Sequence, residues 1–211
     1  MKNILCYGDS NTHGQIGGSE ERYPRDIRWT GRLQKLLGEN YYIIEEGLPG
    51  RTTVWDDPIE EHKNGRKYLL PCLASHRPLD LIVLMLGTND LKLRFSVSPF
   101  DIGESARNLV NTILSSKAGY NFAAPKVLLL APVPIKDVGN EDFNNMLAGG
   151  IPKSLQLASY YRRVAQDLNV HFFDPGEAIE MCREDGVHYT PAGHALMADL
   201  LADKIRSILE D

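Results

Sequence analysis

The segment 81–86 limits the possible folds most, because all six of its residues, LIVLML, are apolar. A strand with one solvated face alternates apolar and polar side chains, whereas a central parallel strand is covered on both faces and shows no alternation. Other short apolar runs occur at residues 3–7, 41–45, 127–131 and 170–173. We therefore predict that these five runs are the strands of a parallel sheet.

Between the runs, apolar residues recur at the spacing of a helix. Three stripes stand out: Trp29, Leu33, Leu36 and Leu37; Ile102, Ala106, Leu109, Val110, Ile113 and Leu114; and Met197, Leu200, Leu201, Ile205 and Ile208. Gly38 is a typical C-terminal end for the first helix, and Thr190-Pro191 is a typical start for the last. Strands that alternate with helices over all 211 residues predict one domain, a doubly wound three-layer α/β/α sandwich.

Charge and cysteine content exclude several classes of protein. The net charge of -5 provides no basic surface for nucleic acid or an anionic membrane, and six consecutive apolar residues cannot span a bilayer. Cys6, Cys72 and Cys182 are odd in number and widely spaced, which argues against a disulfide framework or a zinc site. The start of the chain has no signal-peptide pattern, so we expect a cytoplasmic protein. The charged groups at 20–21 and 63–67 are typical of solvated surface.

The least regular segment is 132–152, which contains Gly139, Gly149 and Gly150 around Phe143 and Met146. A loop of this length is unusual in a small domain and is commonly functional. We expect a lid or a subunit contact here, with an ordinary surface loop as the alternative.

Chemically useful residues follow the predicted strands. The motifs are GDS at 8–10, GLPG at 47–50, GTND at 87–90 and, just before the last helix, DGVH at 185–188. Ligands bind at the carboxyl ends of the strands in open parallel sheets, so we expect these four motifs to meet at one edge.

Together the motifs contain the residues that nucleophilic catalysis by a serine requires: a hydroxyl, a base and a carboxylate. A serine hydroxyl needs a base within hydrogen-bond reach, and His188 can act as that base for Ser10. The imidazole needs a carboxylate to orient it and to stabilise its charged form. Asp185 lies three residues upstream and is the preferred partner, while Asp174 at the end of the fifth run is the main competitor.

A tetrahedral intermediate also needs donors for its oxyanion. The candidates are the backbone N–H groups of Ser10 and Gly50 and the side-chain amide of Asn89. Each motif on its own is also common turn chemistry, and it is their joint occurrence at the strand ends that favours catalysis.

Two further residues are candidates for substrate binding. His13 follows the nucleophile and has a solvated surface histidine as its alternative interpretation. Arg51 follows the oxyanion glycine, with a salt bridge to Asp56 or Asp57 as the alternative. Asp9 and Asp90, by contrast, are expected to brace the turns that carry the catalytic groups.

Two other functions use the same residues. A flavodoxin-like module could hold a flavin phosphate in the loop 10–14, although the Asp9 carboxylate would repel that phosphate. A metal-dependent phosphoesterase could use Asp9, Asp90, Asp185 and His188, although this set lacks the usual number of ligands.

The motifs resemble those of the SGNH hydrolases, the GDSL-type esterases and lipases, whose four marker residues fall on Ser10, Gly50, Asn89 and His188. Nearly the whole chain is similar to the arylesterase/acyltransferase branch, notably in "RWTGRL", "EEGLPGRTT", "DDP", "LPCLASH" and "LDLIVLMLGTNDLK". The resemblance implies a flavodoxin-like sandwich of five parallel strands. It also implies a Ser-His-Asp mechanism that uses no metal or cofactor.

Members of this branch hydrolyse small acyl esters, some transfer the acyl group to alcohols, and some assemble into oligomers around the active site. The resemblance thus implies a small ester substrate and a homo-oligomer. The chain departs from the acyltransferase pattern at "NTHGQ", residues 11–15, where apolar or aromatic residues are expected. This departure predicts a more polar pocket mouth and less efficient acyl transfer in water.

Overall fold

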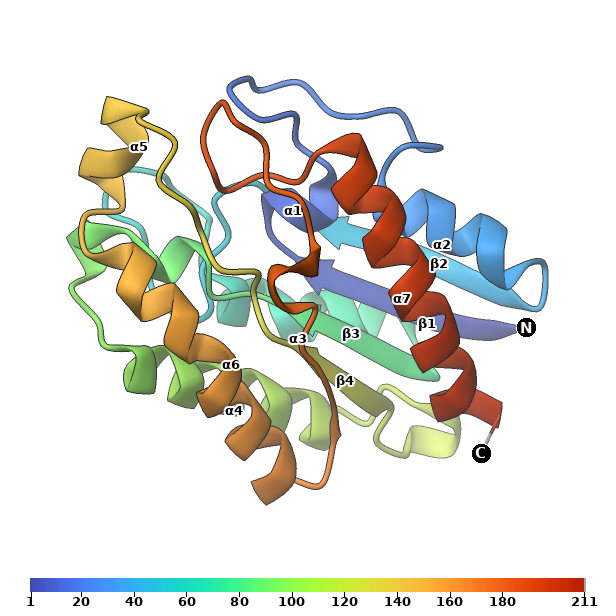
Figure 1. Cartoon of the computed structure of the whole chain (residues 1–211). Helices are drawn as coiled ribbons and strands as arrows, with labels where there is room; N and C mark the ends of the chain where they lie inside the picture. The colour runs from blue at the N-terminus through green and yellow to red at the C-terminus, as the bar shows by residue number, and fades with distance from the viewer. Residues whose placement is uncertain (211) are drawn as a thin grey trace.

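Five parallel strands form the central sheet in the order β2-β1-β3-β4-β5, as Figure 1 shows in part. In this computed structural model, which describes residues 1–210, the strands are β1 (Lys2–Gly8), β2 (Tyr41–Gly47), β3 (Leu81–Met85), β4 (Lys126–Leu130) and β5 (His171–Phe173). All residues of β3 are buried, as the unbroken apolar run predicts. This strand order is that of the flavodoxin-like sheets. β2 is added on one side of β1, and all later strands are added on the other side.

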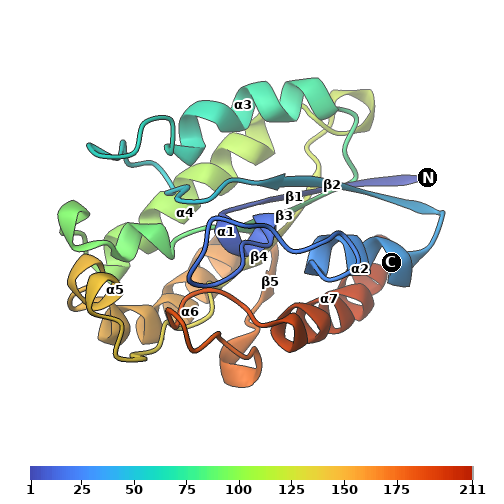
Figure 2. The same cartoon turned by 90° about the horizontal axis from the view of Figure 1, so that it is seen from above.

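Helices cover both faces of the sheet, which confirms the predicted α/β/α sandwich. One hydrophobic core lies under α3 (Gly65–His76), α4 (Pro99–Ser115) and α6 (Gly150–Asp167). A second core lies under α2 (Trp29–Leu37) and α7 (Pro191–Glu210). Figure 2 shows α3 and α4 on one side of the strands and α2 and α7 on the other.

Shorter helices connect these elements. They are α1 (Ser10–His13), α5 (Glu141–Met146) and the 3₁₀ turns Asn89–Leu91, Leu93–Phe95, Tyr120–Phe122 and Gly176–Ala178. Among the described residues, no helix is both long enough and apolar enough to cross a membrane.

The predicted helix ends agree with the structure. Gly38 follows α2 with a φ of 78°, a left-handed conformation that glycine adopts without strain. At the start of α7, the Thr190 hydroxyl accepts a hydrogen bond from the Gly193 N–H at 3.0 Å. This bond satisfies one of the N–H groups that a helix start leaves without an internal acceptor.

The segment 132–152 is more regular than its composition predicts. Asn140 starts α5 by accepting the Phe143 N–H at 3.2 Å, and α6 already begins at Gly150. Only the part before α5 is an extended connection. The interpretation of the whole segment as a loop was therefore wrong, because a side-chain cap nucleates a helix inside it.

His194 is a fully buried histidine on α7. Its Nδ1 accepts the backbone N–H of Trp29 at 3.3 Å, and its ring makes edge contacts with the rings of Tyr23 and Tyr189. Among the described residues its Nε2 has no hydrogen-bond partner. Burial, followed by the nearby positive charges of His188 and Arg28, lowers the pKa of His194 to about 3.

This shift predicts a loss of stability in acid. The unfolded chain takes up the histidine proton near pH 6.5, whereas the folded protein resists it down to about pH 3. The free energy of unfolding that His194 contributes is therefore fully present above pH 6.5 and declines as the pH falls toward 3, by at most about 5 kcal/mol. Asn at this position keeps an acceptor for the Trp29 N–H and does not titrate.

We expect the stability of the unmodified protein to fall more steeply between pH 6.5 and 4 than that of His194→Asn, as measured by urea unfolding at a series of pH values. The buried carboxyls of Asp9 and Asp90 affect both proteins equally. His62→Asn is the matched control, because the His62 side chain is 92 % exposed. Equal pH slopes for His194→Asn and the unmodified protein would contradict this prediction.

Candidate active site

Strand β1 delivers Ser10 to the carboxyl edge of the sheet. Asp9 accepts the Asn11 N–H at 3.0 Å and so caps α1, whose first residue is Ser10. The tight passage from strand to helix requires Gly8, since a Cβ there would lie 2.0 Å from the Thr12 hydroxyl oxygen. The motif GDS thus makes a strand-to-helix turn that presents one hydroxyl.

His188 lies between Ser10 and Asp185. Its Nε2 is 2.9 Å from the Ser10 Oγ, and its Nδ1 is 2.7 Å from the Asp185 Oδ2. Asp174, the competing carboxylate, lies instead 3.9 Å from the Arg162 guanidinium. Serine and histidine are 178 positions apart in the sequence, and all three side chains of this Ser–His–Asp row are buried.

The Asp185 carboxylate is held by several donors. Its Oδ1 accepts the N–H groups of Val187 and His188 and the thiol of Cys182, at 2.8 to 3.0 Å. Its Oδ2 accepts the Gly18 N–H at 3.0 Å in addition to the imidazole. Burial raises the pKa of Asp185, but the hydrogen bond and charge of His188 lower it further, so that the net pKa lies well below its usual range. This carboxylate therefore stays charged beside the His188 imidazole.

Asn11 ties the serine and histidine segments together. Its Nδ2 donates to the Val187 carbonyl at 3.0 Å, and its Oδ1 accepts the Tyr189 N–H at 3.1 Å. Its own carbonyl accepts the Trp29 indole N–H at 3.0 Å. One side-chain amide therefore hydrogen-bonds to the backbone on both sides of His188. The sequence analysis missed this role, because an asparagine after a serine has no recognisable signature.

The three predicted oxyanion donors line one cavity together with His188. Ser10 is the first residue of α1, a position at which a helix leaves its N–H without an internal acceptor. Gly50 has a φ of 78°, which favours glycine. The Asn89 side-chain amide donates to the Arg51 carbonyl at 3.2 Å, which leaves its second N–H for another acceptor.

Asp90 and Asp9 brace the turns around this cavity, in agreement with the sequence interpretation. Asp90 accepts both the N–H and the hydroxyl of Thr53, and thereby connects the GTND turn to the loop after Gly50. Burial raises the pKa of Asp9 and of Asp90 to about 6 in each case.

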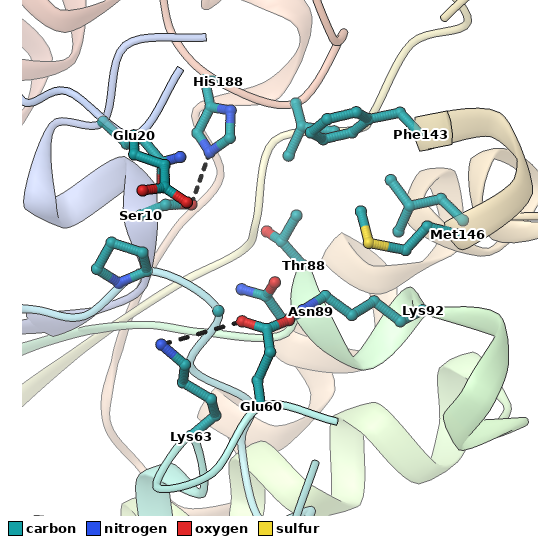
Figure 3. A pocket seen from close by; sticks show the side chains of 15 residues that line it. Ser10, Glu20, Glu60, Lys63, Thr88, Asn89, Lys92, Phe143, Met146 and His188 are labelled. Carbon is teal, nitrogen blue, oxygen red and sulfur yellow. Dashed lines mark hydrogen bonds and ion pairs between the residues drawn. The ribbon is translucent and has the colours of Figure 1, made fainter. Parts of the chain in front are cut away.

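The cavity that contains Ser10 has a volume of about 410 Å³ and two unlike walls. Figure 3 shows Phe143 and Met146 on one side and Glu60 and Lys63 on another. The apolar wall comes mainly from α5, and the Phe143 ring makes an edge contact with the His188 ring, with centroids 6.4 Å apart. The polar wall consists of Gln15, Glu20, Glu60, Lys63 and Lys92.

An ion network fixes part of the polar wall. The buried Lys92 lies 2.7 Å from the Glu60 carboxylate, and Arg94 contacts both Glu60 and Asp57. Lys63 lies 3.9 Å from Glu60. The sequence analysis assigned the charges at 20–21 and 63–67 to ordinary surface. The structure corrects this for Lys63, which lines the cavity next to Glu60; Glu20 is exposed as expected, although it also lines the cavity.

The structure also corrects both predicted substrate contacts, because neither residue lines this cavity. His13 ends α1 and makes a hydrogen bond with the Gly47 backbone. Arg51 is buried: its guanidinium lies 4.1 Å from the centre of the Tyr7 ring and donates to the carbonyl of Gly8 at 2.9 Å. It thereby ties the loop after β2 to the end of β1.

The alternative partners predicted for Arg51 are also wrong. Asp56 pairs with Lys67 at 2.8 Å, and Asp57 pairs with Arg94 at 2.7 Å. Arg51 instead donates to the backbone carbonyls of Gly8 and Glu46 at the ends of β1 and β2.

The comparisons with known proteins agree with this geometry. Residues 6–196 match the model of the GDSL-like lipase/acylhydrolase family. The chain is similar to an aryl esterase from M. smegmatis, with 41% identity and a TM-score of 0.95 over 99% of this chain and 100% of that chain. It is similar also to a carbohydrate acetylesterase from Sinorhizobium meliloti, with 39% identity, a TM-score of 0.95 and the same coverage. The search of curated proteins found no match.

These findings favour neither a flavin-binding module nor a metal-dependent phosphoesterase. The family match spans both the GDS motif and the DGVH motif. The sequence identities to the two esterase structures, 41% and 39%, are high enough to indicate a shared family and not only a shared fold. The sequence resemblance to SGNH hydrolases is therefore confirmed. The chain belongs to the GDSL-like lipase/acylhydrolase family and is a carboxylic ester hydrolase.

Proposed function

We propose that the enzyme hydrolyses esters of short acyl groups through an acyl-enzyme on Ser10. The observation that carries this proposal is the continuous row of hydrogen bonds from Ser10 through His188 to Asp185. In this row the imidazole can take the serine proton while the carboxylate stabilises the charge that forms.

The proposed reaction has two halves. His188 Nε2 removes the hydroxyl proton as the Ser10 Oγ attacks the ester carbonyl carbon. The oxyanion accepts hydrogen bonds from the N–H groups of Ser10 and Gly50 and from the Asn89 amide. The tetrahedral intermediate collapses, His188 returns the proton to the departing alkoxide, and the acyl group stays on Ser10. Water, activated by the same imidazole, then releases the carboxylic acid. An alcohol in place of water would give acyl transfer as a side reaction.

The two walls of the cavity suggest where the two parts of an ester bind, the acyl group at one wall and the alcohol at the other. The side chains of Phe143 and Met146 suit a small apolar acyl group, and the Phe143 ring limits its length close to His188. The charged groups of Glu60 and Lys63 suit an alcohol part rich in hydroxyls. We therefore propose acetyl esters of polyhydroxylated alcohols as substrates, in line with the carbohydrate acetylesterase among the similar structures.

Covalent labelling tests the mechanism. A fluorophosphonate should phosphonylate Ser10, and mass spectrometry of the digested protein should locate the label there. Ser154, which is also buried but hydrogen-bonds to a helix carbonyl, should stay unlabelled. Labelling that persists at full extent in Ser10→Ala would overturn the proposal.

The acyl preference is tested with p-nitrophenyl esters of increasing length. We expect kcat/KM to fall from acetyl through butyryl to octanoyl, because the longer chains meet the Phe143 and Met146 side chains. An octanoyl ester that reacts as fast as the acetyl ester would contradict the proposed acyl wall.

Asn89→Ala should lower kcat by roughly a hundred-fold with little change in KM, the usual effect of losing one oxyanion donor. The reason is that the amide binds the oxyanion more strongly than the ground-state carbonyl. Steady-state kinetics with p-nitrophenyl acetate measure the effect. Circular dichroism checks that the loss of the contact with Arg51 leaves the fold intact, and an unchanged kcat would show that Asn89 is not a donor.

Location and assembly remain proposals. The free thiols of Cys6, Cys72 and Cys182 support a reducing, cytoplasmic location, and the net charge of -5 supports an enzyme that binds neither nucleic acid nor an anionic membrane. The branch resemblance supports a homo-oligomer. Light scattering coupled to size exclusion would measure the assembly, and a mass near the 23.6 kDa of one chain would contradict it.

A further inference from the structure

A second group of reactive side chains lies between β2 and α3, away from the cavity of Ser10. Cys72 and His76 are four positions apart on α3 and so share one side of that helix. Glu46, near the end of β2, faces them: its Oε1 is 2.9 Å from the His76 Nε2. The carboxylate oxygen, the thiol sulfur and the imidazole nitrogen all lie within 4.8 Å of one another.

Thiolate, imidazole and carboxylate are the three kinds of ligand that zinc uses in proteins. With metal–ligand distances of about 2.0 to 2.3 Å in a tetrahedron, the ligand atoms lie roughly 3.3 to 3.8 Å apart. The His76–Glu46 distance of 2.9 Å has to lengthen slightly, and the separations from the Cys72 sulfur, ideally about 3.5 Å, need a contraction of about 1.3 Å at most. Rotation of the partly exposed Glu46 and His76 side chains can supply it.

We propose that Glu46, Cys72 and His76 form a binding site for one divalent ion of the zinc type. Three protein ligands leave a fourth tetrahedral position for water. The Glu46 and His76 side chains are 19 % and 31 % exposed, so an ion can reach them from solvent. Glu46 and Tyr68 also line a cavity of about 520 Å³, which none of the Ser–His–Asp residues lines.

Charge balance sets the character of this site. On binding, the S–H bond of Cys72 breaks, a metal–sulfur bond forms, and the proton goes to the solvent. The ion then faces two anionic ligands, the thiolate and the Glu46 carboxylate. The buried Arg51 donates to the backbone carbonyl of Glu46, not to the carboxylate that would bind the ion.

The spacing of the cysteines alone predicts no zinc site, because no two of them lie close together in the sequence. That argument concerns sites built on several cysteines and does not address a mixed set of ligands. The ligands come from one cysteine, one histidine a helical turn later, and a carboxylate that the sheet brings up from another part of the chain.

Cobalt is the probe for this site, since a thiolate bound to Co²⁺ produces a strong ultraviolet charge-transfer band and tetrahedral coordination produces intense visible bands. The full-length protein, reduced and dialysed against a chelator, is titrated with CoCl₂. We expect both bands to saturate at one ion per chain and to vanish when one equivalent of Zn²⁺ is added. Binding needs no substrate and no active Ser10, so its failure leaves the proposed esterase function intact.

Two variants and two controls identify the ligands. Cys72→Ser should lose the thiolate band, and His76→Ala, whose side chain is partly exposed, should bind zinc at least about 10- to 100-fold more weakly. Cys6→Ala and His62→Ala, which change the same residue types elsewhere, should behave as the unmodified protein. Circular dichroism checks the fold of each variant. Absence of the thiolate band in the unmodified protein, or equal zinc affinity in a folded His76→Ala, would overturn the proposal.

Discussion

Ser10→Ala should reduce the hydrolysis of p-nitrophenyl acetate on the order of a million-fold. The expected loss is this large because the acyl-enzyme cannot form without the hydroxyl, and only the slower direct attack of water, helped by the oxyanion donors, remains. Within the described part of the chain, the Ser10 side chain makes one hydrogen bond, to the His188 Nε2, so its removal should leave the fold unchanged. Steady-state kinetics at high enzyme concentration would measure the remaining rate.

The matched control is Ser154→Ala, which removes another buried hydroxyl without touching the cavity. It should keep the activity of the unmodified enzyme, once a small loss of stability is taken into account. A Ser10→Ala enzyme that retains a substantial part of the activity would show that another group attacks the ester, and the proposed mechanism would have to be abandoned.

Asp185→Asn should lower kcat by about ten-thousand-fold, the known cost of replacing a triad carboxylate with its amide. The new NH₂ group would face the Nδ1 of His188 and the N–H of Gly18, where the carboxylate now accepts two hydrogen bonds. To avoid two donors in contact, the imidazole would place its proton on Nε2 and could no longer accept the proton of Ser10. The opposing oxygen would still accept the Val187 N–H, so the turn should stay in place.

Asp174→Asn is the control for this prediction, because Asp174 is the other carboxylate that the sequence offers as a partner of His188. Its side chain contacts Arg162 and the Gly176 N–H, so its amide should leave kcat unchanged. The kinetics of both variants with p-nitrophenyl acetate distinguish the two carboxylates directly. A larger loss in Asp174→Asn than in Asp185→Asn would reverse the assignment.

The sequence predicts the sheet and the strand-end residues well, for a physical reason. A buried parallel strand is recognisable from its unbroken apolar run, and the topology of such a sheet brings all the carboxyl ends to one edge. Ser10 and Asn89 follow two such strands, and His188 precedes the helix α7 that packs on the same sheet, so their convergence follows from the architecture. No contact between distant side chains has to be known in advance.

The walls of the cavity and the second cluster could not be predicted in the same way. Phe143 reaches the cavity because Asn140 starts a helix inside a segment whose glycines indicate a loop. Arg51 turns toward backbone carbonyls instead of substrate, which depends on where strands β1 and β2 stop. Glu46 meets Cys72 only through the packing of α3 on the sheet. These contacts depend on tertiary distances that have no local pattern.

The grip of Asn11 on the backbone around His188 has a consequence for the order of events in folding. His188 lies in the segment just before α7, and Asn11, which holds the backbone on both sides of it, belongs to α1 near the other end of the sequence. Until α7 docks against α2, the Ser10 hydroxyl lacks its hydrogen bond to His188, even if most of the sheet is already paired. Recovery of catalysis during refolding therefore reports the formation of this long-range contact, and it should lag behind the recovery of secondary structure.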